Sequence, residues 1–152
     1  MSRPPQRIRI LFLCTGNSCR SQMAEGLARA LKGGLVEAYS AGVAPQGLDP
    51  RAVEVMAELG IDISGQRSQG LEEFRGRSFD YVVTLCDHAR QSCPAFPGPA
   101  RRLHLPLEDP PLAAAGAAGE EEALAPYRRV RDHLRAWVEG LPGVLEASRP
   151  QV

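Results

Sequence analysis

The sequence has no long apolar run and no excess charge of either sign, and both absences narrow the classes of protein it can belong to. The apolar stretch at residues 8–14 is too short to cross a bilayer, contains Arg9 and lacks a cleavage-site pattern, so we expect neither a membrane span nor a signal peptide. Eighteen basic residues balance eighteen acidic ones, which leaves no basic surface of the kind that binds nucleic acid.

Aromatic residues are scarce, at 5%, yet 43% of the 152 residues are hydrophobic, which is enough for one buried core. We expect a single domain over residues 7–145, between flexible tails at 1–6 and 146–152. Only four residues are cysteine. Without a secretory signal, such thiols are typical of the reducing cytoplasm, where they are more often catalytic, redox-active or metal-binding than structural.

Apolar periodicity predicts strands that alternate with helices. The strands are expected at 8–13, 35–40, 79–85 and 101–105, and the helices at 20–32, 50–59, 71–75, 87–93 and 121–139. This alternation predicts a single-domain α/β fold with a four-stranded parallel sheet flanked by helices. We also expect residues 112–119 to form a mobile loop, Pro126 to bend the last helix or mark its true start, and that helix to turn most of its arginines to water, namely Arg128, Arg129, Arg131 and Arg135.

The first predicted strand runs directly into a cysteine, five residues, an arginine and a serine, in the order Cys14, Thr15, Gly16, Asn17, Ser18, Cys19, Arg20 and Ser21. Gly16 and Asn17 tolerate positive φ, so the turn from Thr15 to Arg20 can aim successive N–H groups at an anion. The start of the following helix adds its positive dipole end.

This field should hold Cys14 as a thiolate nucleophile. The Arg20 guanidinium can clamp a tetrahedral oxyanion with two parallel hydrogen bonds, and the Ser21 hydroxyl can donate to the sulfur. The alternative is a buried structural cysteine before an ordinary turn, which the surrounding strand, Gly-Asn pair and helix disfavour.

Two further thiols bear on what happens to an adduct at Cys14. Water attacking a phosphocysteine would make a phosphatase, whereas a second thiol attacking the Cys14 sulfur would release arsenate as arsenite. Cys86 ends the third predicted strand and Cys93 follows seven residues later, so Cys86 can attack Cys14, and Cys93 can then attack Cys86. Two alternatives stay open: one core and one incidental cysteine, or a zinc site of all four cysteines, whose gaps fit badly.

A disulfide between Cys86 and Cys93 conflicts with the helix predicted between them. Seven helical residues rise about 10.5 Å, and a disulfide needs Cα atoms within about 7 Å. We therefore predict a reduced helix that unwinds and loops out on oxidation, with room to move in the segment that follows, which contains Pro94, Pro97, Gly98 and Pro99.

An acid is expected at Asp109, which Pro110 biases to an extended backbone. The carboxyl ends of parallel strands meet at one edge, so Cys14, Cys86 and Asp109 should lie together there, and Asp109 could protonate the leaving oxygen. The alternative is a common Asp-Pro turn. The three histidines show no ligand pattern, and His133 is expected on the surface; they are His88, His104 and His133.

These motifs resemble those of thioredoxin-coupled arsenate reductases, which share the low-molecular-weight tyrosine phosphatase fold. The similar stretches are residues 14–21, 40–42, 52–64, 84–86, 93–94, 109–110 and 127–134. The loop is shared with the phosphatases, so the pair of Cys86 and Cys93 is what selects the reductases.

The resemblance implies a thiol relay that reduces arsenate. Cys14 would be the nucleophile, Arg20 the oxyanion ligand, Ser21 the group that tunes the thiolate and Asp109 the acid. A disulfide of Cys86 and Cys93 would be reduced by thioredoxin, while Cys19 would not be required. Phosphate and sulfate would compete with arsenate, and no cofactor would be tightly bound.

Some members of that family hold a potassium ion beside the loop, and Asn17, Glu25 and Ser40 match its site. Arg67 and Gln69 stand where a small hydroxyl residue and an acid would be expected, and an arginine there could replace the cation. No other metal is expected.

Two other functions stay open at this point. One is a low-molecular-weight protein tyrosine phosphatase, although no Tyr or Trp directly follows Asp109-Pro110 to meet a phosphotyrosine ring. The other is a non-enzymatic thiol sensor of arsenite or a soft metal. A reductase built on this loop would still be expected to show weak phosphatase activity, because phosphate and arsenate share shape and charge.

Overall fold

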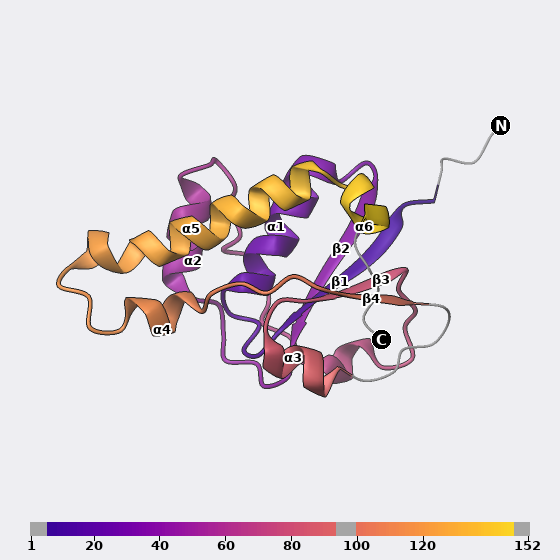
Figure 1. The fold of residues 1–152 in the computed structure, drawn as a ribbon, viewed down its shortest axis with the longest axis horizontal. Helices are drawn as coiled ribbons and strands as arrows, with labels where there is room; N and C mark the ends of the chain where they lie inside the picture. The colour runs from indigo at the N-terminus through magenta and orange to yellow at the C-terminus, as the bar shows by residue number, and fades with distance from the viewer. Residues whose placement is uncertain (1–5, 94–99, 148–152) are drawn as a thin grey trace.

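The computed structural model describes residues 6–93 and 100–147 and confirms the alternation of strands and helices. Four strands form one parallel sheet in the order β2-β1-β3-β4 (Figure 1): β1 (Ile8–Cys14), β2 (Val36–Gly42), β3 (Tyr81–Thr84) and β4 (Arg101–His104). The helical elements are α1 (Arg20–Lys32), α2 (Pro50–Ala57), the 3-10 turn η1 (Leu71–Phe74), α3 (Asp87–Ser92), α4 (Pro110–Ala114), α5 (Glu120–Glu139) and α6 (Gly143–Ala147).

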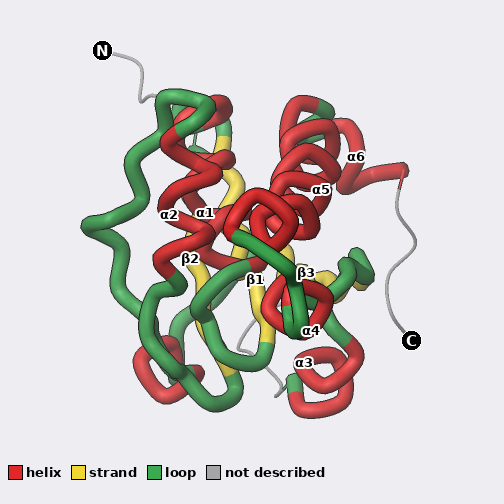
Figure 2. The backbone as a smooth tube through the Cα atoms, turned by 90° about the vertical axis from the view of Figure 1, so that its left-hand side faces the viewer, coloured by secondary structure: helices red, strands yellow, loops and turns green. Residues whose placement is uncertain are grey.

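Helices cover both faces of the sheet, which explains why β1 is an almost continuous apolar run. Successive side chains of a strand point to opposite faces. Ile10 and Phe12 therefore pack in the core formed with α1, α2 and α5, whereas Leu11 and Leu13 pack with η1 and α3 on the other side. Figures 1 and 2 show α1, α2 and α5 grouped together and α3 on the opposite side of the strands.

The strand register brings the ends of the strands level at one edge. Cys14 pairs with Gly42 of β2, Leu13 pairs with Thr84 of β3, and Thr84 pairs with His104 of β4. The loops that leave β1, β3 and β4 therefore start side by side, which is where α/β sheets carry their sites.

One local prediction was wrong, and one of the two alternatives given for another is excluded. Residues 112–119 do not form one loop, because α4 covers Pro110–Ala114; the proline at its first position has φ preset for a helix and needs no N–H partner there. Pro126 does not mark the start of the last helix, since α5 begins at Glu120 and continues through it. Three glutamates in the first turn of α5 interact favourably with its positive dipole end.

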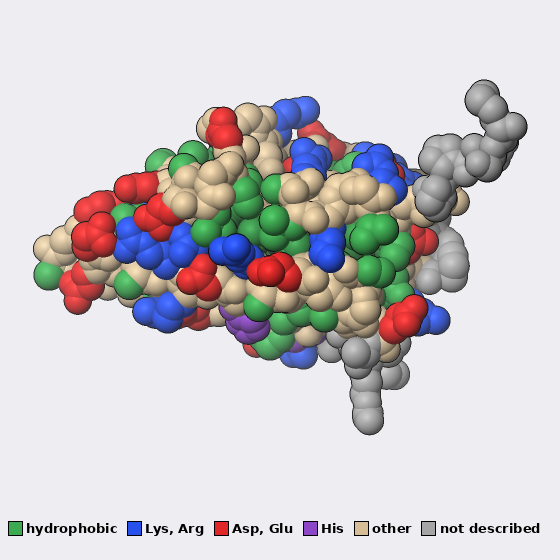
Figure 3. Space-filling view, turned by 90° about the horizontal axis from the view of Figure 1, so that it is seen from above, with side chains coloured by type: hydrophobic (Ala, Val, Ile, Leu, Met, Phe, Trp, Pro, Cys, Tyr) green, Lys and Arg blue, Asp and Glu red, His purple; other side chains and the backbone are tan. Residues whose placement is uncertain are grey.

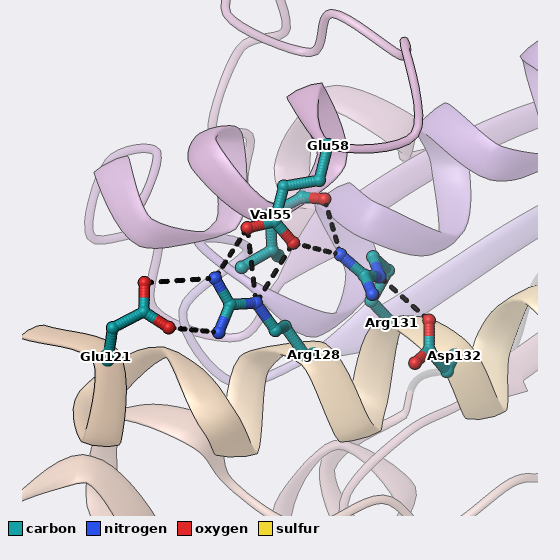
Figure 4. A network of polar contacts seen from close by, with 6 residues as sticks. All are labelled: Val55, Glu58, Glu121, Arg128, Arg131 and Asp132. Atoms are coloured by element: carbon teal, nitrogen blue, oxygen red, sulfur yellow. Dashed lines mark hydrogen bonds and ion pairs between the residues drawn. The ribbon is translucent and has the colours of Figure 1, made fainter.

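The arginines of α5 do not all face water, which corrects the expectation from helical periodicity. Arg131 is only 8% exposed; its Nη1 donates to the Val55 carbonyl at 2.9 Å and to Glu58 Oε1 at 2.6 Å. Arg128 contacts Glu58 at 2.7 Å and Glu121 at 2.9 Å (Figure 4). A carbonyl and a carboxylate of the α2 region thus satisfy a guanidinium that periodicity alone assigns to solvent.

Acidic and basic side chains are interspersed on the face drawn in Figure 3, in keeping with the balanced charge of the sequence. His133 is exposed, as expected. None of the helices in the described ranges is long and apolar enough to span a membrane. The predicted tails at 1–6 and 146–152 lie almost entirely outside the described residues, and α6 continues to Ala147, so the domain limits remain a prediction.

Candidate active site

The loop between β1 and α1 is hydrogen-bonded to the segment that follows β2, residues 43–49. Backbone N–H groups of this segment donate to the carbonyls of Cys14, Thr15, Gly16 and Ser18 at 2.8–3.2 Å. The C=O and the following N–H of a trans peptide point in opposite directions. The N–H groups that follow those four carbonyls therefore point away from this segment, as an anion-binding nest requires.

Close approach of backbone to backbone explains the glycine that ends β2. A Cβ on Gly42 would lie 2.7 Å from both the Asn17 nitrogen and the Thr15 oxygen, so a side chain there would displace the loop. Asn17 takes positive φ, at 46°, as expected, whereas Gly16 does not; Gly16 instead leaves room for the Gln46 side chain, which would lie 2.9 Å from a Cβ.

A chain of hydrogen bonds prepares the Cys14 sulfur. Ser21 Oγ lies 2.9 Å from Cys14 Sγ, and Asn17 Nδ2 donates to Ser21 Oγ at 2.8 Å. Asn17 Oδ1 accepts from the Gln69 backbone N–H at 2.6 Å, so the amide nitrogen must be the atom that faces Ser21. Because Ser21 accepts from Asn17, its own hydrogen is free to donate to the Cys14 sulfur.

Gln22 supports Asn17 in this series of hydrogen bonds, and the sequence did not predict it. Its Nε2 lies 2.9 Å from the Asn17 carbonyl oxygen, 3.1 Å from Asn17 Oδ1 and 2.9 Å from the Arg67 carbonyl oxygen. Gln66 in turn donates to Gln22 Oε1 at 2.8 Å. Neither residue belongs to a motif, and Gln22 lies off the predicted apolar face of α1, so the sequence carries no signal for this contact.

Arg20 is positioned across the mouth of the loop. Its Nη1 donates to the Leu107 carbonyl at 3.2 Å, and its Nη2 lies 4.0 Å from Asp109 Oδ2. Asp109 and the loop line one cavity of about 230 Å³, together with Gln46 and Pro111. The structure therefore brings Cys14, Arg20 and Asp109 to a single cavity, whereas Cys86, predicted at the same edge, is not among the residues that line it.

Cys86 lies beside the same loop. Its Sγ is 3.3 Å from Thr15 Oγ1 and accepts from the Ala89 N–H at 3.4 Å. Thr15 is the residue after Cys14, so the second thiol reaches the edge of the sheet at which the first one lies.

Cys93 stands at the other end of α3. Cys86 precedes this helix and Cys93 follows it, so the disulfide predicted between them requires the helix to open. Burial raises the pKa of the Cys93 thiol, while Arg102 acts in the opposite direction. Cys93 is thus held as a neutral thiol. The prolines and glycine at 94–99 lie outside the described residues.

The surroundings of Cys19 disfavour its thiolate form. The residue is buried before the first turn of α1, and desolvation, with a further contribution from Asp49, raises its pKa well above the ordinary value. The structure thus gives a physical reason for the expectation that this thiol is not required.

The residues matched to a potassium site do not fit a cation here. Ser40 donates to Glu25 Oε1 at 2.7 Å, and Arg29 pairs with the other oxygen of Glu25 at 3.2 Å. Asn17 Oδ1 already accepts from two N–H groups. Burial raises the pKa of Glu25, which further weakens it as a ligand for a monovalent cation.

Arg67 does not replace the cation, contrary to expectation. Its side chain is 76% exposed and pairs with Glu73 at 3.4 Å. Only its backbone carbonyl turns inward, toward the Gln22 amide. Across residues 6–93 and 100–147, no group of three or more His, Cys, Asp or Glu side chains is arranged to hold a metal ion.

A parallel α/β sheet whose first strand ends in a cysteine-to-arginine oxyanion loop defines a phosphatase-like class of thiol protein. The sequence matches the low molecular weight phosphotyrosine protein phosphatases over residues 9–149. The chain belongs to this family and, within it, to the group of the arsenate reductases.

Relatives and solved structures agree on that group. The chain is 47% identical to arsenate reductases of Halalkalibacterium halodurans and Bacillus subtilis over 125 residues, which cover 82% of this chain and 88% of each relative. It resembles an arsenate reductase in a phosphate-binding state with a TM-score of 0.70 at 34% identity, covering 88% of this chain and 95% of that one.

A second solved structure shows a thioredoxin-dependent relative. This arsenate reductase from Corynebacterium glutamicum is 26% identical with a TM-score of 0.67, and the match covers 93% of this chain and 63% of that one. An arsenate reductase in an oxidised state matches with a TM-score of 0.69 at 33% identity, over 90% of this chain and 98% of that one.

Proposed function

We propose that this protein reduces arsenate to arsenite through a relay of Cys14, Cys86 and Cys93. The observation that carries the proposal is the position of Cys86, whose sulfur lies 3.3 Å from the hydroxyl of Thr15, the residue next to Cys14. A phosphatase built on the same loop has no need of a second thiol there. The similarity of the chain to arsenate reductases supports the same reaction.

The first step uses the oxyanion loop. The Cys14 thiolate attacks arsenic, forming an S–As bond as one As–O bond breaks, and Asp109 supplies a proton to the departing oxygen. The Arg20 guanidinium and the N–H groups of the loop hold the remaining oxygens. Phosphate and sulfate have similar shape and charge and are expected to compete.

The second step is the reduction. The Cys86 thiolate attacks Cys14 Sγ, so an S–S bond forms as the S–As bond breaks. The electron pair of that bond stays on arsenic, which passes from As(V) to As(III) and leaves as arsenite. The two thiols supply both electrons.

The third step moves the disulfide outward. Cys93 attacks Cys86 Sγ, Cys14 leaves as thiolate, and α3 opens to let the two sulfurs meet. Thioredoxin then reduces the Cys86–Cys93 disulfide by exchange; the Corynebacterium glutamicum relative is thioredoxin-dependent. No metal and no tightly bound cofactor takes part. All four cysteines are free thiols, which suits work in a reducing cytoplasm.

The test is arsenate-dependent NADPH consumption in the presence of thioredoxin and its reductase. Cys14→Ser should abolish consumption, and Cys86→Ser should do the same. Cys93→Ser should stop after one turnover with Cys14 and Cys86 oxidised. Hydrolysis of p-nitrophenyl phosphate is the matched control, because of the three relay thiols it needs only that of Cys14. A Cys86→Ser variant that still turns over arsenate would refute the relay.

A further inference from the structure

The thiol of Cys86 and the imidazole of His88 both contact the Thr15 hydroxyl, although they lie far from it in the sequence. Thr15 Oγ1 lies 3.3 Å from Cys86 Sγ and 3.4 Å from His88 Nδ1. A hydroxyl carries one hydrogen and two lone pairs, so it can accept from a thiol and donate to an imidazole at once. The arrangement is that of a two-bond proton path from sulfur to histidine.

We propose that His88 takes the proton of the Cys86 thiol through the Thr15 hydroxyl, an inference that rests on the proposed role of Cys86. Cys86 gives its proton to Thr15 Oγ1 as Thr15 gives its own to His88 Nδ1. The products are a Cys86 thiolate, an unchanged Thr15 and a His88 imidazolium. No electrons move in this step, and the exposed imidazolium returns the proton to water.

The reduction step needs such an acceptor. Only the thiolate attacks a sulfur, and an ordinary thiol is mostly protonated near neutral pH. Imidazole is the side chain that exchanges a proton in this range. The Ala89 N–H, at 3.4 Å from Cys86 Sγ, then stabilises the negative charge left on sulfur. His88 acts through Thr15 and is therefore a positioning residue that does not contact arsenate.

The carboxylate nearest to this path along the chain is engaged elsewhere. Asp87 lies between Cys86 and His88 in the sequence. Its carboxylate lies 3.4 Å from Arg90 Nη2 and 3.2 Å from His104 Nε2. These two contacts direct it toward its own helix and toward β4, so His88 is the proton acceptor that the Thr15 hydroxyl reaches.

Other titratable or cationic groups in this part of the molecule include Cys14, Arg20, Cys93 and Arg102. Cys14 Sγ is hydrogen-bonded to Ser21 Oγ at 2.9 Å, and Arg20 Nη1 donates to the Leu107 carbonyl at 3.2 Å. Arg102 Nη1 donates to the Cys93 carbonyl at 3.5 Å, at the far end of α3 from Cys86. These contacts are made to other groups, and the proton of Cys86 keeps its route through Thr15 to His88.

The test measures how fast iodoacetamide alkylates Cys86 in the reduced full-length protein, from about pH 5.5 to about 9. Initial rates are read from the Cys86 peptide by mass spectrometry. His88→Gln should lower the rate roughly three- to tenfold near neutral pH and converge with the wild type at the alkaline end, where hydroxide removes the proton directly. His133→Gln, on the exposed face of α5, is the matched control and should change nothing.

A second pair of variants tests the hydroxyl. Thr15→Ser keeps the path and should keep the wild-type pH profile, whereas Thr15→Val should reproduce His88→Gln. A His88→Gln rate equal to wild type at every pH, or lowered equally at every pH, would overturn the proposal. So would an equal fall at Cys14, which would indicate a disturbed loop.

The assay contains no arsenate and separates this inference from the proposed function. An absent arsenate reductase activity with an intact pH signature would refute only the function. An active enzyme without the signature would refute only the proton path.

Discussion

At the scale of single residues, the reactivity of Cys14 is set by where one hydrogen points. Asn17 has its oxygen engaged by Gln69 and Gln22, so its N–H is directed at Ser21. Ser21 accepts that bond and has its hydrogen left for Cys14 Sγ at 2.9 Å. In the proposed mechanism, a donor aimed at sulfur assists Cys14 as the attacking group and, in the third step, as the leaving group.

Replacing Ser21 with alanine should therefore slow Cys14 chemistry. A hydrogen bond to a charged group is worth about 1.5–3 kcal/mol, so arsenate turnover should fall roughly ten- to a hundredfold. Cys14 alkylation near neutral pH should fall in parallel. Ser78→Ala, just before β3, is the control and should keep wild-type rates. Unchanged turnover in Ser21→Ala would show that the loop N–H groups suffice.

At the scale of elements, α3 separates the thiols of Cys86 and Cys93, and the proposed relay requires this helix to unfold. It spans only Asp87–Ser92, with Cys86 before it and Cys93 after it. The carboxylate of its first residue, Asp87, lies 3.2 Å from His104 Nε2 of β4. A helix this short derives little stability from its own hydrogen bonds and depends on such tertiary contacts. Formation of a disulfide across it can therefore open it at small cost.

Oxidation should expose the backbone of α3. Amide hydrogens of residues 87–92 should exchange much faster in the oxidised protein than in the reduced one, while β1 stays protected. Hydrogen exchange followed by mass spectrometry would show this. Cys93→Ser treated with the same oxidant is the control and should keep the reduced pattern. Equal protection of α3 in both states of the wild type would contradict the disulfide relay.

At the scale of the whole molecule, charged groups fasten α5 to α2 across the top of the core. Glu58 accepts from both Arg128 and Arg131 (Figure 4), and these bonds lower the pKa of Glu58 to about 2. The same face supports the loop, because Tyr127 of α5 donates to Asp49 at 2.6 Å and the Asp49 N–H donates to the Ser18 carbonyl.

Glu58→Gln should lower the free energy of unfolding by about 1 kcal/mol near neutral pH, after allowance for solvent screening of this partly exposed group. Since the pKa of Glu58 is depressed on folding, its contribution is complete above its ordinary pKa of 4.5 and is lost as the pH falls toward about 2. Urea unfolding of both proteins should thus converge in acid. Glu54→Gln, exposed on the same helix, is the control; a pH-independent difference would argue against the ion pair.

Much of the fold followed from local pattern. The run from Ile8 to Cys14 is buried on both faces and could only be a central strand, and Gly33 and Pro50 bounded helices as such residues do. The burial of Arg131 did not follow from local pattern. Periodicity places it near the solvent side of α5, and only the arrival of Val55 and Glu58 from α2 makes its burial favourable.

The sequence by itself determined the composition of the oxyanion loop, because Cys14, five turn residues, Arg20 and Ser21 occupy eight consecutive positions. The loop is held by contacts from residues 43–49 and from Gln69. Only the tertiary structure decided how the thiols meet. Thr15 and Cys86 are 71 positions apart, and Thr15 and His88 are 73 apart. A strand register shifted by one residue would turn Cys86 to the other face of the sheet. Such contacts depend on register and crossover geometry, which no local pattern of residues contains.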